Sequence, residues 1–225
     1  MSSTNRGGKR SEADDYSTPY WCTERLMDLI DLLPGGRWCE PAAGDGYIVQ
    51  AIKRDDVTFD LYELRKPCEK KLKALAKNDK RVKSVTICDW INRPFRKKRY
   101  DVLITNPPFH LAEDFLKTGL ARARYTVLLL RLNYIGTDKR WDWMHGNMPK
   151  AYVLPNRPSF NDDGKTDSIE YAWMVWDADN PVSEAPWRLL ARTPRHLRTM
   201  LPPPPLPELS EAVEPDPMQR RMHGK

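Results

Sequence analysis

The most informative residues of the chain form a tetrapeptide, Asn106-Pro107-Pro108-Phe109, directly after a strand-like run at residues 100–105. The prolines lack a backbone donor and restrict the backbone before them, so the carbonyl groups that precede them stay available as acceptors. The Asn106 side chain adds a second acceptor, and Phe109 adds a flat apolar ring. Two acceptors beside a stacking ring suit a planar substrate with an exocyclic amino group, such as a nucleobase. A tight turn after a buried strand is the simpler alternative.

A glycine-containing loop lies about sixty residues upstream. A short strand is expected to end at Glu40, and Gly44 and Gly46 then lead into a helical stretch at residues 47–53. Glycines in a strand–turn–helix unit let a ligand approach the main chain closely. The spacing is not G-x-G-x-x-G and no Walker A lysine follows, so neither a dinucleotide nor a nucleoside triphosphate is the first expectation.

Two further expected strands end in a carboxylate. Residues 57–63 end at Glu63, which is placed to accept hydrogen bonds from ribose hydroxyl groups. Residues 82–90 end at Asp89, which can accept from an adenine amino group, and at Trp90, which can pack near the ring. An acid at a strand end is most often a solvated loop residue, but the order and spacing of these motifs support one another.

Together these motifs resemble class I S-adenosylmethionine-dependent methyltransferases, in the amino-methyltransferase branch with an N/D-P-P-Y/F motif. The resemblance covers residues 16–177. It implies the catalytic residues Asn106, Pro107, Pro108 and Phe109. It implies an S-adenosylmethionine site made by Tyr16, Thr18, Pro19, Glu40, Pro41, Ala42, Gly44, Gly46, Glu63, Leu64, Asp89, Trp90 and Asn106. The glycine loop departs from the commoner aromatic-x-Gly-x-Gly form, since Pro41 and Ala42 replace its leading residues.

The fold that the resemblance implies is α/β and Rossmann-like. We expect a seven-stranded, mostly parallel sheet with helices on both faces and a C-terminal antiparallel hairpin. The remaining expected elements are a helix at residues 110–124 and strands at 125–130, 151–154 and 169–176. Residues 1–15 are expected to be a flexible N-terminus, 16–190 the methyltransferase domain and 191–225 a proline-rich, disordered tail. The core leaves no segment for a separate target-recognition domain.

A formal net charge of +6 and a pI of about 9.1 are consistent with a polyanionic partner. Candidate nucleic-acid contacts are Arg131, Asn133, Lys139, Arg140, Arg157 and Lys165. The segment at residues 131–143 leaves the carboxyl end of its strand, where ligands bind in open α/β sheets. Its Trp141 and Trp143 contact the substrate in one interpretation and seal a helix onto the sheet in the other.

Composition favours a cytoplasmic enzyme, and the resemblance implies a bacterial or phage-infected cell. No apolar run of about 18 residues is present, and residues 1–15 contain no apolar signal segment. The four cysteines are dispersed and no histidine has metal-ligand spacing, so neither a disulfide nor a metal site is expected. A monomer or homodimer is expected, and the proline-rich tail is a candidate site for a protein partner.

The leading function implied by the resemblance, above all to small phage-type enzymes, is methyl transfer to the N6 amine of adenine in DNA. Transfer to an RNA base amine, adenine-N6 or guanine-N2, is the main alternative, because Asn-Pro-Pro-Phe followed by His110 resembles ribosomal guanine-N2 enzymes. DNA cytosine-N4 transfer, protein-glutamine transfer and a catalytically silent nucleic-acid-binding module also remain open.

Overall fold

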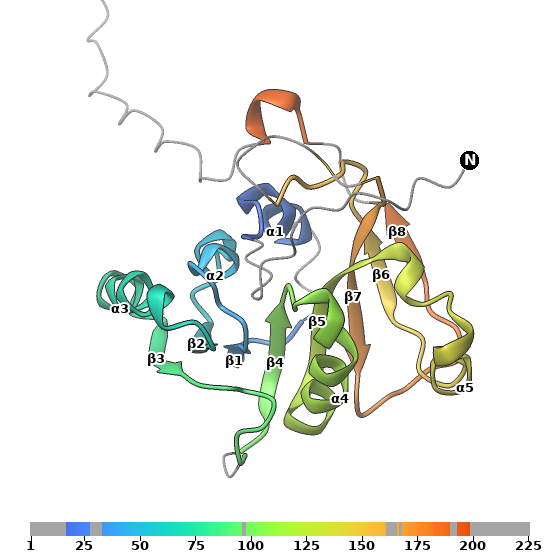
Figure 1. The fold of residues 1–225 in the computed structure, drawn as a ribbon, viewed down its shortest axis with the longest axis horizontal. Coiled ribbons are helices and arrows are strands. Elements are labelled where there is room, and N and C mark those ends of the chain that lie inside the picture. Colours follow the sequence, from blue (N-terminus) through green and yellow to red (C-terminus); the bar gives the residue numbers. More distant parts are fainter. Residues whose placement is uncertain are drawn as a thin grey trace, which may run out of the picture.

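A computed structural model describes residues 17–27, 33–95, 98–160, 166, 168–189 and 193–198 of the 225-residue chain. Its centre is one sheet of eight strands in the order β3-β2-β1-β4-β5-β7-β6-β8 (Figure 1). The strands are β1 (Gly36–Glu40), β2 (Val57–Glu63), β3 (Val82–Ile87), β4 (Tyr100–Thr105), β5 (Ala123–Arg131), β6 (Lys150–Val153), β7 (Tyr171–Asp177) and β8 (Trp187–Leu189).

The pairing confirms the expected fold class. Strands β3, β2, β1, β4 and β5 are all parallel, whereas β7 pairs antiparallel with both β5 and β6. The sheet differs from the expected seven-stranded one in having an eighth strand, β8, a short edge strand that pairs parallel with β6. Its residues lie in a proline-flanked stretch without strand periodicity, so backbone pairing and not sequence pattern makes it a strand.

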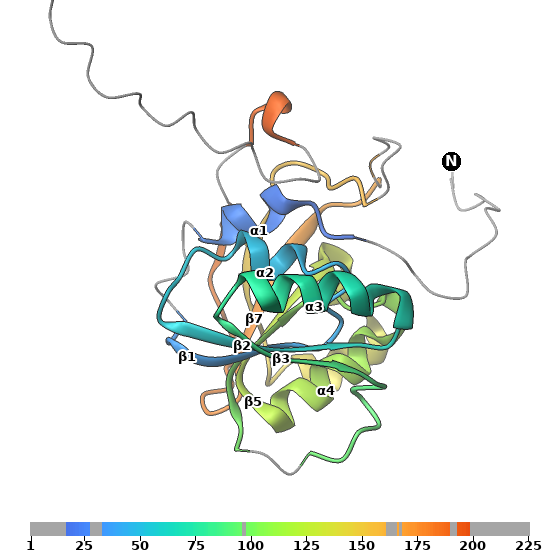
Figure 2. The ribbon, with the colours of Figure 1, turned by 90° about the vertical axis from the view of Figure 1, so that its left-hand side faces the viewer.

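Helices cover both faces of the sheet. They are α1 (Tyr20–Met27), α2 (Tyr47–Ala51), α3 (Glu69–Asn78), α4 (Ala112–Arg122) and α5 (Trp141–Met144). Figure 2 shows α1, α2 and α3 on one side of the sheet and α4 on the other. Two hydrophobic clusters fill these layers, one around Trp38 and Trp173 and the other around Leu103 and Leu128. The middles of the central strands, residues 102–104 of β4 and 127–130 of β5, are continuous apolar runs because both of their faces are buried.

Several element boundaries differ from the sequence-based expectation. The helix expected to reach residue 124 ends at Arg122, because Ala123 already pairs with Tyr100 in the sheet. The strand expected to reach residue 90 ends at Ile87, because the Asp89 carboxylate accepts the backbone N–H of Ile91 and closes a turn. In both cases long-range pairing or a local side-chain bond overrides the sequence pattern.

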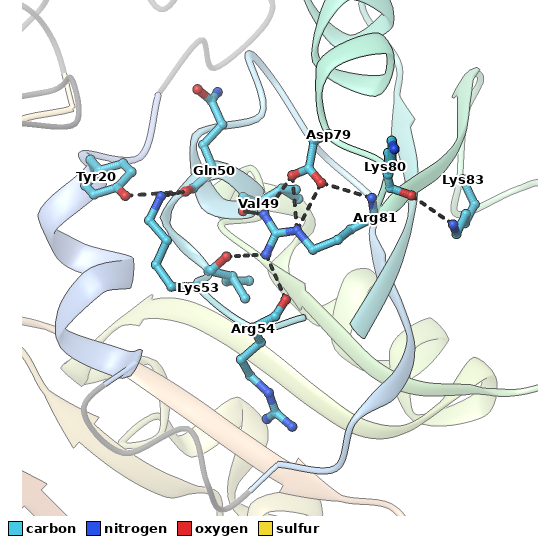
Figure 3. A network of polar contacts seen from close by, with 10 residues as sticks. Tyr20, Val49, Gln50, Lys53, Arg54, Asp79, Lys80, Arg81 and Lys83 are labelled. Carbon is cyan, nitrogen blue, oxygen red and sulfur yellow. Dashed lines mark hydrogen bonds and ion pairs between the residues drawn. The ribbon is translucent and has the colours of Figure 1, made fainter. Parts of the chain in front are cut away.

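The Arg81 guanidinium fastens the end of α2 to the strands. It donates to the backbone carbonyls of Ile52 at 2.5 Å and Arg54 at 3.0 Å, and it pairs with Asp79 at 2.7 Å (Figure 3). The last carbonyls of a helix have no partner within the helix, so a cation with several donors is well suited to this place. Arg81 therefore holds the helix that follows the glycine loop.

Within the described ranges, no helix is both long and apolar enough to cross a lipid bilayer.

We predict that Arg81→Met lowers the free energy of unfolding by about 1–3 kcal/mol, because buried carbonyl acceptors lose their donors. Urea denaturation measures the change. The matched control is Lys83→Met, which removes an exposed cation whose ammonium group donates only to the Lys80 carbonyl. The control should change stability by less than about 0.5 kcal/mol. Equal effects of the two variants would contradict the capping role of Arg81.

Candidate active site

A cavity of about 440 Å³ opens where the parallel strands end. The order of the sheet reverses between β1 and β4, and such a switch point leaves a crevice at the carboxyl ends of the strands. The crevice brings together Glu40 from β1, Glu63 from β2, Asp89 after β3 and Asn106 after β4. Residues implied as cofactor-binding that line the cavity are Thr18, Glu40, Pro41, Ala42, Gly44, Glu63, Leu64, Asp89, Trp90 and Asn106. Tyr16 lies outside the described residues.

The glycines of the loop have separate tasks. Gly44 and Gly46 both adopt positive φ, at 53° and 80°. Gly44 lines the cavity, whereas a Cβ atom at Gly46 would lie 2.6 Å from the Leu75 side chain of α3. Gly46 is therefore required for close packing of the loop against α3. Neither Gly46 nor Pro19 is part of the cavity wall.

The Glu63 carboxylate joins the glycine loop to β2. One oxygen accepts the Gly44 N–H at 2.6 Å, and the other accepts the backbone N–H of Arg65 at 2.9 Å and its Nε at 3.0 Å. Glu63 is only 4% exposed. Each carboxylate oxygen can accept two hydrogen bonds, so the oxygen bound to Gly44 keeps capacity for a hydroxyl group of a ligand.

Glu40 is a buried carboxyl group with an unused acceptor. It is 1% exposed, and within the described chain its Oε2 atom has no hydrogen-bond partner. Burial raises the pKa of Glu40 well above its usual range, and the neighbouring Glu63 carboxylate raises it further. A buried, unpaired acceptor costs free energy unless a ligand satisfies it. Glu40 thus fits a ligand that brings a cation or a hydrogen-bond donor into the cavity.

The cavity wall contains more acidic than basic side chains, unlike the chain as a whole. Its acidic lining residues are Glu40, Asp45, Glu63, Asp89 and Asp114, against Arg65 and His110 as the basic ones. Arg65 is itself paired with Glu63 at 3.0 Å. An acidic wall in a protein of net charge +6 favours a cationic ligand and disfavours phosphate groups.

Asp89 and Trp90 differ in what they offer to a ligand. Asp89 is exposed, and it already accepts hydrogen bonds from the backbone and the side chain of Asn92. The Trp90 ring is 3% exposed and stacks on Phe115, with the centroids 5.9 Å apart. Its opportunity to contact a ligand is therefore small. Leu64, which is 65% exposed at the cavity, provides the accessible apolar surface.

The Asn106 side chain also has an unused acceptor, because its buried Oδ1 atom has no hydrogen-bond partner among the described residues. Pro107 and Pro108 follow it along the cavity wall, but Phe109 is not part of that wall. The Phe109 ring instead contacts Phe160 at 6.3 Å and Tyr171 at 6.0 Å, both measured between centroids. The sequence did not indicate these two partners, since Phe160 follows β6 and Tyr171 begins β7.

Most of the candidate nucleic-acid contacts already have partners within the chain. The Arg131 guanidinium lies 4.5 Å from the centroid of Phe109 and donates to the Tyr171 hydroxyl at 3.1 Å. The charged groups of Lys139 and Arg140 lie within 3.8 Å of the Glu113 carboxylate.

Three further residues complete the set of candidate contacts. Arg157 pairs with Glu170 at 2.6 Å. Asn133 is exposed after β5, and Lys165 lies outside the described residues. Of the five candidates that the structure describes, Arg131 is the one in contact with Phe109 of the candidate catalytic motif.

The two tryptophans after β5 take opposite positions. Trp143 packs against the hydrophobic cluster on the α4 face. Trp141 is 61% exposed and stacks on His145, with the centroids 5.1 Å apart. The interpretation that these tryptophans seal a helix onto the sheet therefore holds for Trp143 and is wrong for Trp141.

No disulfide joins Cys22, Cys39, Cys68 or Cys88. A search of the described part of the chain finds no group of three potential metal ligands.

No protein-family model and no curated protein matches the chain. Several solved structures, however, are similar to it. A candidate RNA methyltransferase from Pyrococcus horikoshii superposes with a TM-score of 0.59 at 18% identity, over 80% of this chain and 95% of that one. A candidate class I S-adenosylmethionine-dependent methyltransferase from Listeria monocytogenes gives 0.56 at 14% identity, over 81% and 68%. The 23S rRNA methyltransferase ErmE gives 0.55 at 12%, over 72% and 69%.

These similarities establish the fold, which is that of class I S-adenosylmethionine-dependent methyltransferases. S-adenosylmethionine is the cofactor that the sequence motifs imply. The acidic cavity and the unpaired Glu40 oxygen agree with this expectation, because the cofactor carries an ammonium group and a sulfonium group.

We predict that Glu40→Gln becomes increasingly stabilising, in the protein without cofactor, as the pH rises from about 5 to 8. The folded-state pKa is raised, so the folded protein holds this proton more tightly than the unfolded chain does. The contribution of Glu40 to stability therefore falls as the pH rises above the unfolded pKa of about 4.3. One differentially bound proton changes the free energy of unfolding by about 1.4 kcal/mol per pH unit.

Urea denaturation at several pH values measures the difference between the Glu40→Gln variant and the wild type. Glu184→Gln is the matched control, because Glu184 is exposed. A difference that does not change with pH would contradict the proton-holding role of Glu40. The Gln variant should also bind S-adenosylmethionine more weakly, which calorimetry would detect.

Proposed function

We propose that the protein transfers a methyl group from S-adenosylmethionine to the exocyclic amine of a nucleobase, with the N6 amine of adenine in DNA as the leading substrate. The observation that carries the proposal is the buried, unpartnered Oδ1 atom of Asn106 at the wall of an acidic cavity. A substrate amine is the kind of donor that this acceptor lacks.

The residues of the cavity suit the parts of S-adenosylmethionine. The Glu40 carboxylate is suited to the ammonium group, Glu63 to the ribose hydroxyls and Asp89 to the adenine amine. Leu64 offers apolar surface for the adenine ring. When bound, the cofactor supplies an electrophilic methyl group, and the acidic wall favours its positive charge.

The catalytic role of Asn106 follows from the chemistry of an aromatic amine. The lone pair of such an amine is delocalised into the ring, which makes the nitrogen a weak nucleophile. Hydrogen bonds from the amine to Asn106 Oδ1 and to the Pro107 carbonyl favour a pyramidal nitrogen with a localised lone pair. These bonds strengthen as positive charge develops on the nitrogen, so they stabilise the transition state more than the ground state.

Phe109 is proposed to stack on the target base. Such stacking contributes about 1–3 kcal/mol per base in single-strand binding proteins. In a duplex the base must first leave the stack, which costs a few kcal/mol. Because Arg131 lies 4.5 Å from the Phe109 centroid, it is placed to support the ring or to contact the phosphate beside the flipped nucleotide.

The choice between DNA and RNA rests on two different observations. DNA is favoured by the resemblance of residues 157–173 to small phage-type adenine methyltransferases. RNA is favoured by the structural neighbours, since one is a candidate RNA methyltransferase and another is a 23S rRNA methyltransferase. Cytosine-N4 transfer uses the same amine chemistry.

We predict that Asn106→Ala lowers methyl transfer by about 100-fold or more, as removal of one preorganised polar group does in other enzymes. Labelled S-adenosylmethionine is offered with unmethylated duplex DNA, single-stranded DNA and total RNA in parallel, and the product is digested to nucleosides. Asn78→Ala is the matched control, because Asn78 is exposed at the end of α3.

Labelled N6-methyladenine in DNA would establish the leading function, and label only in RNA would establish the alternative. Cofactor binding without transfer to any substrate would refute catalysis and leave a binding module. Full activity of Asn106→Ala would remove the proposed role of the amide.

A further inference from the structure

Residues 193–198, which the sequence places in the tail, are anchored to the folded domain. Thr193 is fully buried. Its hydroxyl accepts the Arg25 Nε–H of α1 at 2.9 Å, and its backbone N–H donates to Asn156 Oδ1 at 2.9 Å. Two segments far apart in sequence therefore fix the start of this stretch, which we call the hook.

The rest of the hook is a closed turn that faces solvent. The Leu197 N–H donates to the Pro194 carbonyl at 3.0 Å, and Arg198 Nε donates to the Thr193 carbonyl at 2.9 Å. Residues 194–198 are all exposed. The buried anchor and the closed turn hold the side chains of Arg195 and Arg198 in a defined region of the surface.

The hook lies on the outer side of α1, at the end of the molecule where β4 finishes (Figures 1 and 2). Asn156, its second anchor, comes three residues after the carboxyl end of β6. Thr18, just before α1, lines the cavity. The helix α1 begins two residues later at Tyr20, and Arg25 lies five residues further, or roughly 8 Å along the helix axis. The hook is thus a neighbour of the proposed active site.

The charge of the hook is available to a ligand. Among the described residues, no carboxylate pairs with Arg195 or Arg198. Arg140 and Arg157, by contrast, face Glu113 and Glu170. Two arginines without acidic partners, on a fixed turn, are suited to phosphate groups.

We propose that the hook binds the phosphate backbone of the nucleic-acid substrate beside the target base. The inference rests on the proposed function. The acidic wall of the cavity disfavours phosphates, so the backbone must be held outside it. Backbone contacts position a nucleic acid without reading its sequence.

The test measures nucleic-acid affinity of the full chain as a function of salt, with duplex DNA and with single-stranded RNA. Arg195→Ala/Arg198→Ala should weaken binding at low salt by on the order of tenfold. It should also make the salt slope shallower, by about 0.9 per lost duplex phosphate contact or about 0.7 for a single strand. Arg195→Ala alone keeps the Arg198 bond to Thr193 and should lose about half of the effect.

Two further variants test whether binding depends on the total positive charge of the chain or on positive charge at the hook. Lys70→Ala/Lys77→Ala removes the same charge from the exposed surface of α3 and should leave the slope close to that of the wild type. Arg195→Lys/Arg198→Lys keeps the charge and should retain most of the slope. S-adenosylmethionine affinity should be unchanged in all variants, and thermal stability should be unchanged in the variants that keep Arg198, which donates to the Thr193 carbonyl.

If the salt slope of Arg195→Ala/Arg198→Ala is unchanged, or changes as much as that of Lys70→Ala/Lys77→Ala, the proposed role of the hook is wrong. That result leaves the proposed function intact. A wild-type chain that neither binds nor methylates DNA or RNA would overturn the proposed function and the hook together. The nucleic acid whose slope changes identifies the substrate that the hook contacts.

Discussion

Parallel pairing of β1 with β2 and β4 is the constraint on which the site depends. It directs the carboxyl ends of these strands to one edge, and the reversal of strand order opens a crevice between β1 and β4. The Glu63 carboxylate then ties the glycine loop to the end of β2 through the Gly44 N–H. The carboxyl groups of Glu40, Glu63 and Asp89 and the amide group of Asn106 come from four separate segments. They converge at this crevice because backbone hydrogen bonds position the segments, with little help from direct contacts between these side chains.

Charge is segregated within this small protein. The chain as a whole is basic, but the cavity at the strand ends is acidic. This arrangement suits the two ligands of the proposed function, a cationic cofactor and a polyanionic substrate. Several basic residues near the strand ends are neutralised by ion pairs, including Arg140 with Glu113 and Arg157 with Glu170. These pairs hold the loops in place and leave less of the formal charge for a ligand than a residue count suggests.

Eight buried side-chain atoms lack partners in the described chain, and two of them, Glu40 Oε2 and Asn106 Oδ1, belong to residues that line the cavity. Native proteins satisfy nearly all buried polar atoms, so unpaired acceptors at a cavity wall suit a place where a ligand completes the structure. One atom lies at the end of β1 and the other after β4, on the two sides of the switch point. Their positions are those expected of a pocket that holds a cofactor next to a substrate amine.

The sequence by itself determined the limits of β2 and β4 through local periodicity. Through the family resemblance of its motifs it also determined the sheet class and three of the five cavity acids, Glu40, Glu63 and Asp89. Only the tertiary structure decided three other features. Phe109 turns toward Phe160 and Tyr171, Gly46 serves packing against α3, and Thr193 is buried beneath Arg25 and Asn156. Each of these contacts joins segments that are distant in the chain, and no local pattern of residues records which distant surface a side chain will meet.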